Sequence, residues 1–347
     1  MLHALQFWLY DYDPIAPLAF EEPLNAIKAR LAEGEEYFEG LIQSYFVANK
    51  HKTRVLLVPD TELNQRDETS EKEKLASIQK EMSSEEIEEM IRTTKELIEI
   101  QNTPDTPKNL ATLPTLELKD LDKENKRIPI AEERINDVTV LHHDLATNGI
   151  FYLGMGLDLH TLPEDLLPYT ELFGRALLEV GTDSEDFVKL SQRIGRDTGG
   201  IYPSIFTSTI WESNESAAYL FLHGKSTVEQ AEKLSGLLHD VLLTAKLDNA
   251  ERFKQIVLEE KAGMESGLIP SGHMVVHGRL ASKFHEAGWL EEKMEGIDFL
   301  FFLRELAERI EEDWQGVLAD LELIRELLIN QSNLLFNITC NAKAWQI

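Results

Sequence analysis

Hydrophobic residues alternate with polar or small residues in several short stretches of the second half of the chain. Between positions 150 and 159 every second residue is hydrophobic: Phe151, Leu153, Met155, Leu157 and Leu159. Successive side chains of a strand point to opposite faces of a sheet, so this period is typical of a half-buried strand. Together with short apolar runs, such patterns predict strands at 138–141, 150–159, 201–211, 216–223 and 334–339.

Turn sequences join two pairs of these predicted strands. The dipeptide Asn148-Gly149 is typical of a tight hairpin turn, so we expect 138–141 and 150–159 to pair as a hairpin. The polar residues 212–215 predict a second pair, formed by 201–211 and 216–223.

Other segments carry apolar residues three and four positions apart, which is the spacing of an amphipathic helix. In the second half of the chain this spacing predicts helices at 162–180, 185–196, 228–245, 250–265 and within 297–329. Gly316 interrupts the last stripe at a cost of about 1 kcal/mol relative to alanine, so we expect two helices there. Strand pairs followed by strings of helices indicate an α+β fold, with helices packed on one face of a mainly antiparallel sheet.

The first 115 residues have a different organisation. Helices are predicted at 21–30 and 37–47, followed by a buried strand at 54–58, and residues 1–59 are interpreted as the C-terminal part of an incomplete α/β lobe. Residues 60–102 contain neither glycine nor proline, and their 13 acidic and 6 basic residues give a net charge of −7. A capping box at Ser83 and Glu86 predicts that two helices meet near 82–84.

A proline-containing segment, 103–114, follows this predicted helical hairpin as a linker. We therefore divide the chain into three predicted domains. They are the incomplete lobe (1–59), the charged helical hairpin with its linker (60–115), and a nearly complete α+β lobe (116–347).

Charge limits the partners of the chain. The 34 Lys and Arg against 62 Asp and Glu give a net charge of −28, and no basic patch is visible, so we expect no binding to nucleic acid or to anionic membranes. No apolar run approaches the roughly 18 residues of a membrane-spanning helix. The same negative field favours a cationic partner. The single cysteine, Cys340, cannot form an intramolecular disulfide and is predicted to be structural.

Few residues suggest chemistry directly. His273 and His277 are four apart and could share a helix face, as metal ligands do, but we favour a role in packing or in lining a polar cavity. His142, His143 and Asp144 stand at a predicted strand end just before Asn148, and one of them could contact a ligand or substrate.

Adjacent strand residues point to opposite faces, so His142 and His143 are not expected to share a metal. Gly199-Gly200 is predicted to turn a helix into a strand, with an anion-binding role as the alternative. These eight positions are candidates for a cavity or substrate contact. No residue is assigned to catalysis or to metal binding.

Several stretches together resemble a known family. They begin at Phe7 (FWLYDYDP), Val140 (VLHHDLATNGI), Phe173 (FGRALLEVGT) and Leu190 (LSQRIGRDTGGI), and they resemble the presequence proteases of the pitrilysin and insulinase superfamily of zinc metalloendopeptidases. The resemblance implies a pitrilysin-like fold of four lobes in two halves, which a helical hairpin joins around a chamber for unfolded peptides. This chain would then correspond to the end of the second lobe, the hairpin and the third lobe.

The resemblance also implies where the catalytic groups lie. Zinc in these enzymes is held by an H-x-x-E-H motif and a downstream glutamate in the first lobe, and an Arg and a Tyr of the last lobe assist catalysis. Neither region is present, and the sequence contains no H-x-x-E-H. We therefore expect zinc in the full-length enzyme, none bound by this segment, and no activity of the chain alone.

The hypothesis from this resemblance is a fragment, or a split subunit, of a zinc endopeptidase that degrades short unfolded peptides, in particular basic targeting peptides. Its partners would be those peptides and the missing lobes. The alternative is a non-catalytic peptide-binding or assembly subunit built on the same lobes. The expected location is the cytoplasm in a bacterium, or a mitochondrion or plastid in a eukaryote, and residues 1–13 do not have the pattern of a targeting segment.

Overall fold

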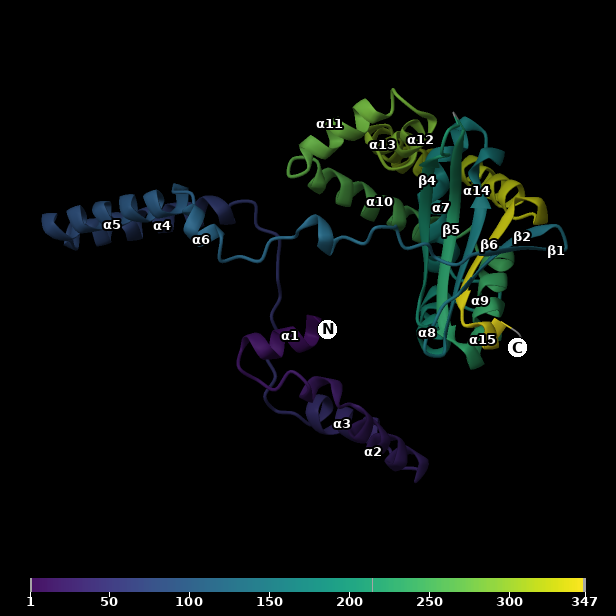
Figure 1. The fold of residues 1–347 in the computed structure, drawn as a ribbon, viewed down its shortest axis with the longest axis horizontal. Coiled ribbons are helices and arrows are strands. Elements are labelled where there is room, and N and C mark those ends of the chain that lie inside the picture. The colour runs from purple at the N-terminus through teal and green to yellow at the C-terminus, as the bar shows by residue number, and fades with distance from the viewer. Residues whose placement is uncertain (1, 214, 346–347) are drawn as a thin grey trace. The chain divides into compact units, whose positions relative to one another are not determined.

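A computed structural model describes residues 2–213 and 215–345 of the chain. The residues fall into two compact units, one up to Glu117 and one from Leu118 onward. Figure 1 shows the sheet in the second unit and only helices and connecting segments in the first. Each unit is described by itself below.

The second unit is built on a six-stranded sheet. Its strands are β1 (Ala131–Ile135), β2 (Val138–Asp144), β3 (Ile150–Asp158), β4 (Ile201–Thr209), β5 (Ser216–Thr227) and β6 (Leu334–Cys340). Their order in the sheet is β1-β2-β6-β3-β5-β4, and only the β2–β6 pair is parallel. The predicted pairing of 201–211 with 216–223 is confirmed by the antiparallel β4–β5 pair.

The predicted hairpin between 138–141 and 150–159 is wrong, because β6 lies between β2 and β3. Ile338 of β6 is opposite His142 on one side and opposite Leu153 on the other. Asn148 and Gly149 do form a tight turn, with φ of +52° and +83°, but the strands on either side of this turn diverge. Turn chemistry is local, whereas the pairing depends on where the apolar strand β6 is buried, some 200 residues later in the chain.

The hairpin that does form here is β1–β2, which the sequence analysis missed. Asn136 and Asp137 both adopt positive φ in its turn. Strand β1 is an edge strand with exposed side chains throughout, so its sequence AEERI has no hydrophobic alternation to detect.

The helices of the second unit match most of the predicted positions. They are α7 (Thr170–Glu179), α8 (Phe187–Asp197), α9 (Ala231–Thr244), α10 (Ala250–Gly267), α13 (Ile297–Glu312) and α14 (Trp314–Leu328). Residues 164–169, around Pro168, form a 3₁₀ helix ahead of α7. Three helices were not predicted: α11 (Gly272–Ala281), α12 (Glu286–Met294) and α15 (Ala342–Trp345).

The break in the last long helical stripe is confirmed, and Asp313 forms it. The side chain of Asp313 accepts a hydrogen bond from the Gly316 backbone N–H at 3.0 Å and thereby caps the start of α14. Gly316 therefore lies in the first turn of the second helix, three residues after the break.

Helices cover one face of the sheet and form the hydrophobic core with it. The strand side chains on this face, including Leu157, Leu220 and Leu222, are completely buried against residues of α7, α9 and α14. This arrangement confirms the predicted α+β class, with helices packed on a mostly antiparallel sheet. Cys340 is also fully buried, and this burial raises the pKa of its thiol, as expected for a structural cysteine.

The first unit contains helices and no strand within the part of the chain that the structure describes. The helices are α1 (Leu2–Leu9), α2 (Glu21–Ala32), α3 (Tyr37–Ile42), α4 (Leu63–Glu81), α5 (Ser84–Asn102) and α6 (Pro107–Leu110), and a π turn continues α3 to Val47. The predicted strand at 54–58 is wrong. These residues are irregular and exposed, because a strand needs a neighbouring strand for its backbone hydrogen bonds and none lies beside them here.

Two extended residues separate α4 from α5, which confirms the predicted break near 82–84. Ser83 caps α5: its Oγ accepts from the Glu86 N–H at 3.2 Å, and the Glu86 carboxylate accepts from the Ser83 N–H at 2.8 Å. These hydrogen bonds also lower the pKa of Glu86. The capping box therefore satisfies donors at the start of α5 that the helix itself leaves free.

Replacing Ser83 with alanine is expected to destabilise the start of α5 by about 1 kcal/mol, because the cap is lost. Hydrogen exchange should show faster exchange of the Glu86 and Ile87 amides in the Ser83→Ala chain. Ser84→Ala changes the adjacent serine, which makes no capping bond, and serves as the control. Equal exchange in both variants would contradict the role given to Ser83.

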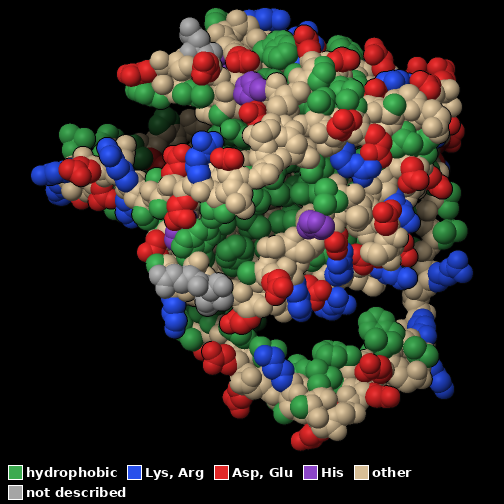
Figure 2. Space-filling view, turned by 90° about the vertical axis from the view of Figure 1, so that its right-hand side faces the viewer, with side chains coloured by type: hydrophobic (Ala, Val, Ile, Leu, Met, Phe, Trp, Pro, Cys, Tyr) green, Lys and Arg blue, Asp and Glu red, His purple; other side chains and the backbone are tan. Residues whose placement is uncertain are grey.

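Hydrophobic side chains also remain at the surface. Figure 2 shows them gathered in the centre of one face, with acidic and basic side chains along its borders. In the first unit the apolar stripe of α5 is exposed, including Met90, Ile91, Leu97 and Ile98. Among the described residues, no helix is both long and apolar enough to cross a membrane.

Candidate functional site

The face of the sheet opposite the core helices carries a shallow pocket of about 430 Å³. Strand alternation places Leu153 and Met155 of β3 in the core and turns Tyr152, Gly154 and Gly156 to the other face. The pocket, which we call the open-face trough, is lined by Tyr152, Leu153, Gly154, Gly199, Tyr202, His223, Gly224, Lys225, Asn337 and Thr339.

The missing side chains of two glycines make room for the rings of the neighbouring strand. A Cβ atom at Gly156 would lie 2.9 Å from the Phe221 ring, and one at Gly154 would lie 3.3 Å from Nδ1 of His223. The rings of β5 therefore lean over β3. A larger residue at Gly156 would collide with Phe221, so this position requires glycine for packing.

Aromatic rings form a continuous cluster along β4 and β5. His223 stacks between Tyr202 and Phe221, with ring centroids 5.1 Å and 5.2 Å away. Tyr219 and Phe206 contact the far side of Phe221, at 5.8 Å and 6.3 Å. Because of these neighbours Phe221 is only 8% exposed although it lies on the open face. The cluster is thus a rigid apolar floor with polar groups at its edge.

His223 is the titratable ring of this cluster. Its Nε2 lies 2.9 Å from Oγ of Ser204, and burial lowers its pKa, so the imidazole is neutral at pH 7. No carboxylate is paired with it among the described residues, and the groups needed to activate a nucleophile are therefore missing. The trough is suited to bind a chain through ring stacking and hydrogen bonds. It is not suited to hydrolyse one.

Of the residues singled out in the sequence, Gly199 lies in this trough. Its N–H donates to the Lys225 carbonyl at 2.7 Å, and a Cβ at this position would lie 2.8 Å from Cγ of Lys225. Gly200 follows with φ of +109°, a conformation that favours glycine. The pair connects α8 to β4, as the sequence analysis expected, and brings the backbone close to Lys225.

His142 and His143 lie on opposite faces of the sheet. His142 is buried on the core side, where it stacks on Trp345 at 4.6 Å and its Nε2 lies 3.3 Å from the Cys340 carbonyl. Nδ1 of His143 lies 2.8 Å from the Pro129 carbonyl.

The neighbouring Asp144 accepts a hydrogen bond from the Ala342 N–H at 2.7 Å. Asn148 adopts a positive φ and shapes the turn that follows. None of these four predicted positions, His142, His143, Asp144 and Asn148, lines the open-face trough.

His273 and His277 both lie on α11, as their spacing predicted. Other residues of this helix line a separate pocket, to which neither histidine belongs. In the part of the chain that the structure describes, no three His, Cys, Asp or Glu side chains are placed so that they could hold a metal ion.

Sequence reasoning missed the aromatic cluster itself. Its signal was present: Tyr219, Phe221 and His223 occupy every second position of one predicted strand, on the face opposite the leucines. That pattern shows which residues share a face, but the face that would be open depends on where the helices pack.

Comparisons with known proteins cover nearly the whole chain. Residues 57–306 match the family described as Peptidase M16c associated. The chain is 37% identical over 346 residues to presequence protease 1, chloroplastic/mitochondrial, of Arabidopsis thaliana, covering 99% of this chain and 32% of that protein. It is 34% identical to protein HypA of Clostridium perfringens, covering 97% of this chain and 34% of that protein.

More distant relatives show the same proportions. The mitochondrial presequence protease of Danio rerio is 25% identical over 94% of this chain and 32% of its own length. The chain therefore spans about a third of the length of these curated relatives. Among solved structures, a conserved protein from Enterococcus faecalis V583 is similar with a TM-score of 0.44 and 12% identity, over 62% of this chain and 49% of that one.

Proposed function

The chain belongs to the Peptidase M16c associated family and is a segment of a presequence-protease-like peptidase, and from this premise we propose that it forms the hinge and part of the peptide chamber of a zinc endopeptidase. The observation that carries the proposal is the unbroken match of 346 residues to one third of a presequence protease. In this proposal the remaining two thirds supply the lobes that complete the enzyme.

Zinc belongs to the rest of that enzyme in this proposal. The described residues of this chain do not fit a zinc site, since no three potential ligands converge. We therefore assign no ligand and no catalytic step to them. Their proposed work is to bind and orient the peptide against the open-face trough.

Exposed apolar surface supports the need for further parts. None of the described residues in helices α2 to α6 is buried, although these helices carry many apolar side chains. Exposed apolar surface on this scale is usual where another protein surface packs. We propose that the other lobes of the enzyme cover it, either in the same chain or as a separate subunit.

The substrates proposed are short unfolded peptides with basic residues. The net charge of −28 favours cationic partners, and the Arabidopsis relative is named for presequences. The proposed location follows the relatives: the cytoplasm in a bacterium, or a mitochondrion or plastid in a eukaryote.

The proposal is tested with a chimera. The matched third of the Arabidopsis protease is replaced by this chain, and cleavage of a basic presequence peptide is measured with and without a zinc chelator. We expect chelator-sensitive cleavage by the chimera. We expect neither cleavage nor bound zinc for the chain alone, and no cleavage by the protease without its matched third.

Two results would count against this function. Zinc-dependent cleavage by the chain alone would show a complete active site within it. A folded chimera that binds zinc and peptide but does not cleave would support the alternative, a non-catalytic peptide-binding or assembly subunit.

A further inference from the structure

A second pocket, separate from the open-face trough, lies among helices α10 to α13. Its volume is about 340 Å³, at the lower end of the range of about 300–1,000 Å³ typical of ligand pockets. It is lined by Met264, Gly267, Leu268, Ser271, Met274, Val275, Gly278, Glu291, Glu292, Glu295, Gly296 and Ile297, and shares no residue with the trough. We call it the helical pocket.

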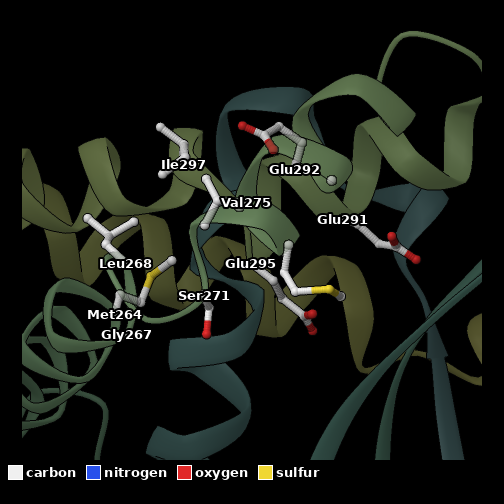
Figure 3. A pocket seen from close by; sticks show the side chains of 12 residues that line it. Met264, Gly267, Leu268, Ser271, Val275, Glu291, Glu292, Glu295 and Ile297 are labelled. Carbon is white, nitrogen blue, oxygen red and sulfur yellow. The ribbon is translucent and has the colours of Figure 1, made fainter. Parts of the chain in front are cut away.

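The helical pocket has an apolar side and an acidic side. Figure 3 shows Met264, Leu268 and Ile297 together on one side, and Glu291 and Glu295 on the other. The methionine side chains are flexible and polarisable, and such residues adapt to apolar partners of different shape. The apolar side could therefore receive one or two hydrophobic side chains of a partner.

Two of the three glutamates at the pocket lack a positive partner. Glu292 is buried and ion-paired with Arg279, which also contacts Asp298 and so ties α11 to the start of α13. Among the described residues, neither Glu291 nor Glu295 forms an ion pair, and the one side-chain hydrogen bond of Glu291 comes from Thr207 at 2.8 Å.

Repulsion between carboxylates is visible at the same place. Burial together with the neighbouring charges of Glu291 and Glu260 raises the pKa of Glu295. Glu171, which lies near Glu260 and Glu295, has its pKa raised to about 7 for the same reasons. A cation bound beside Glu295 would relieve this repulsion, whereas an anionic ligand would increase it.

Apolar surface extends beyond the pocket along α11. No residue of α11 is buried, and Met274 and Leu280 are each more than half exposed. Ile269, between α10 and α11, is 94% exposed. This surface is larger than a small organic cation would cover, and it favours a chain with several apolar side chains.

We propose that the helical pocket binds a cationic amphipathic peptide segment, which places apolar side chains against Met264, Leu268 and Ile297 and a Lys or Arg beside Glu295. Apolar burial provides the affinity, and the unpaired carboxylates select the charge and the register. The inference goes beyond the proposed chamber wall, because the pocket shares no residue with the trough and requires no catalytic lobe. It would hold part of a basic peptide while another part contacts the trough.

Binding is measured on the intact 347-residue chain by fluorescence anisotropy. The probe is a labelled peptide of about 15 residues, with leucine and arginine side chains about one helical turn apart. Two further peptides carry citrulline in place of arginine, or serine in place of leucine. We expect both to bind at least about tenfold more weakly, and binding of the first peptide to weaken between about 50 and 300 mM NaCl.

Gly278→Leu fills the pocket without disturbing the fold. A Cβ at Gly278 meets no atom within 4 Å, and leucine is a better helix former than glycine. We expect binding to weaken about tenfold or more. Gly236→Leu, at an exposed and equally open position of α9, is the matched control and should bind within about twofold of the unchanged chain.

Glu295→Gln removes the carboxylate that lacks an ion pair. A partly exposed charge pair is worth up to about 1 kcal/mol, so we expect affinity for the arginine peptide to fall about three- to fivefold. Affinity for the citrulline peptide should not change. Glu308→Gln, on the exposed face of α13, changes the net charge equally and should leave both affinities unaltered.

Several outcomes would overturn the proposal: no binding of the arginine peptide, equal binding by the Gly278→Leu chain, or full competition by arginine amide alone. Loss of binding in Tyr202→Ala but not in Gly278→Leu would place the peptide on the open-face trough and also reject it. None of these variants enters the chimera experiment, so failure here is distinguishable from failure of the proposed protease function.

Discussion

Replacing Phe253 with alanine is expected to lower the free energy of unfolding of the second unit by about 3–5 kcal/mol. Phe253 lies in α10, is completely buried, and packs at 6.0 Å from the Trp314 ring of α14. Loss of the ring removes this contact and leaves a cavity where α10, α13 and the start of α14 meet, and a close-packed core collapses only partly around such a cavity.

Urea unfolding of the intact chain, followed by tryptophan fluorescence, measures this effect because Trp314 reports on the same region. Phe284→Ala is the matched control, since the Phe284 side chain is 82% exposed and its loss should change stability by less than about 0.5 kcal/mol. If the two variants unfolded at the same urea concentration, the assignment of Phe253 to the core would be wrong.

Replacing Glu171 with glutamine is expected to stabilise the chain at pH 8 and to have little effect at pH 4. Burial, with repulsion from Glu260 and Glu295, raises the pKa of Glu171 from its ordinary value to about 7 in the folded state, although Arg175 partly opposes the shift. The folded state therefore holds this proton more tightly than the unfolded state does. Below the unfolded pKa the carboxyl is protonated in both states, and glutamine imitates it.

As the pH rises from about 4.5 to about 7, ionising Glu171 costs the folded state more than the unfolded state, and stability is lost across that window. The gain expected for Glu171→Gln at pH 8 is about 1–2 kcal/mol after allowance for solvent screening. Thermal unfolding at pH 4, 6 and 8 measures it. Glu305→Gln, at an exposed site on α13, controls for net charge, and an equal gain in that variant would contradict the local explanation.

Most helices were predictable because their signals are local. The spacing of apolar residues determined α7, α9, α10 and α14, and the capping box at Ser83 located the start of α5. The strands β3, β5 and β6 were likewise visible as alternation or as short apolar runs. The resemblance to presequence proteases, carried by four short stretches, is confirmed by the match to one third of these enzymes.

Strand order and the irregular segment at 54–58 were not predictable in this way. An apolar run reads the same whether or not a neighbouring strand is present, so 54–58 was taken for a buried strand. The turn at Asn148-Gly149 suggested a hairpin, but its strands are separated by β6, which is nearly 190 residues away in sequence. Pairing depends on contacts between distant residues, and local patterns contain no information about them.

The two candidate sites divide in the same manner. The sequence by itself determined the class of fold, the family and the negative charge that favours a cationic peptide, because composition and periodicity depend on each residue and its near neighbours. Only the tertiary structure decided that Tyr202, His223 and Phe221 form one open-face cluster, and that Glu295 meets Met264 and Ile297 in a pocket. A binding site requires side chains from separate elements to converge, and their convergence is set by how helices and strands pack around the common core.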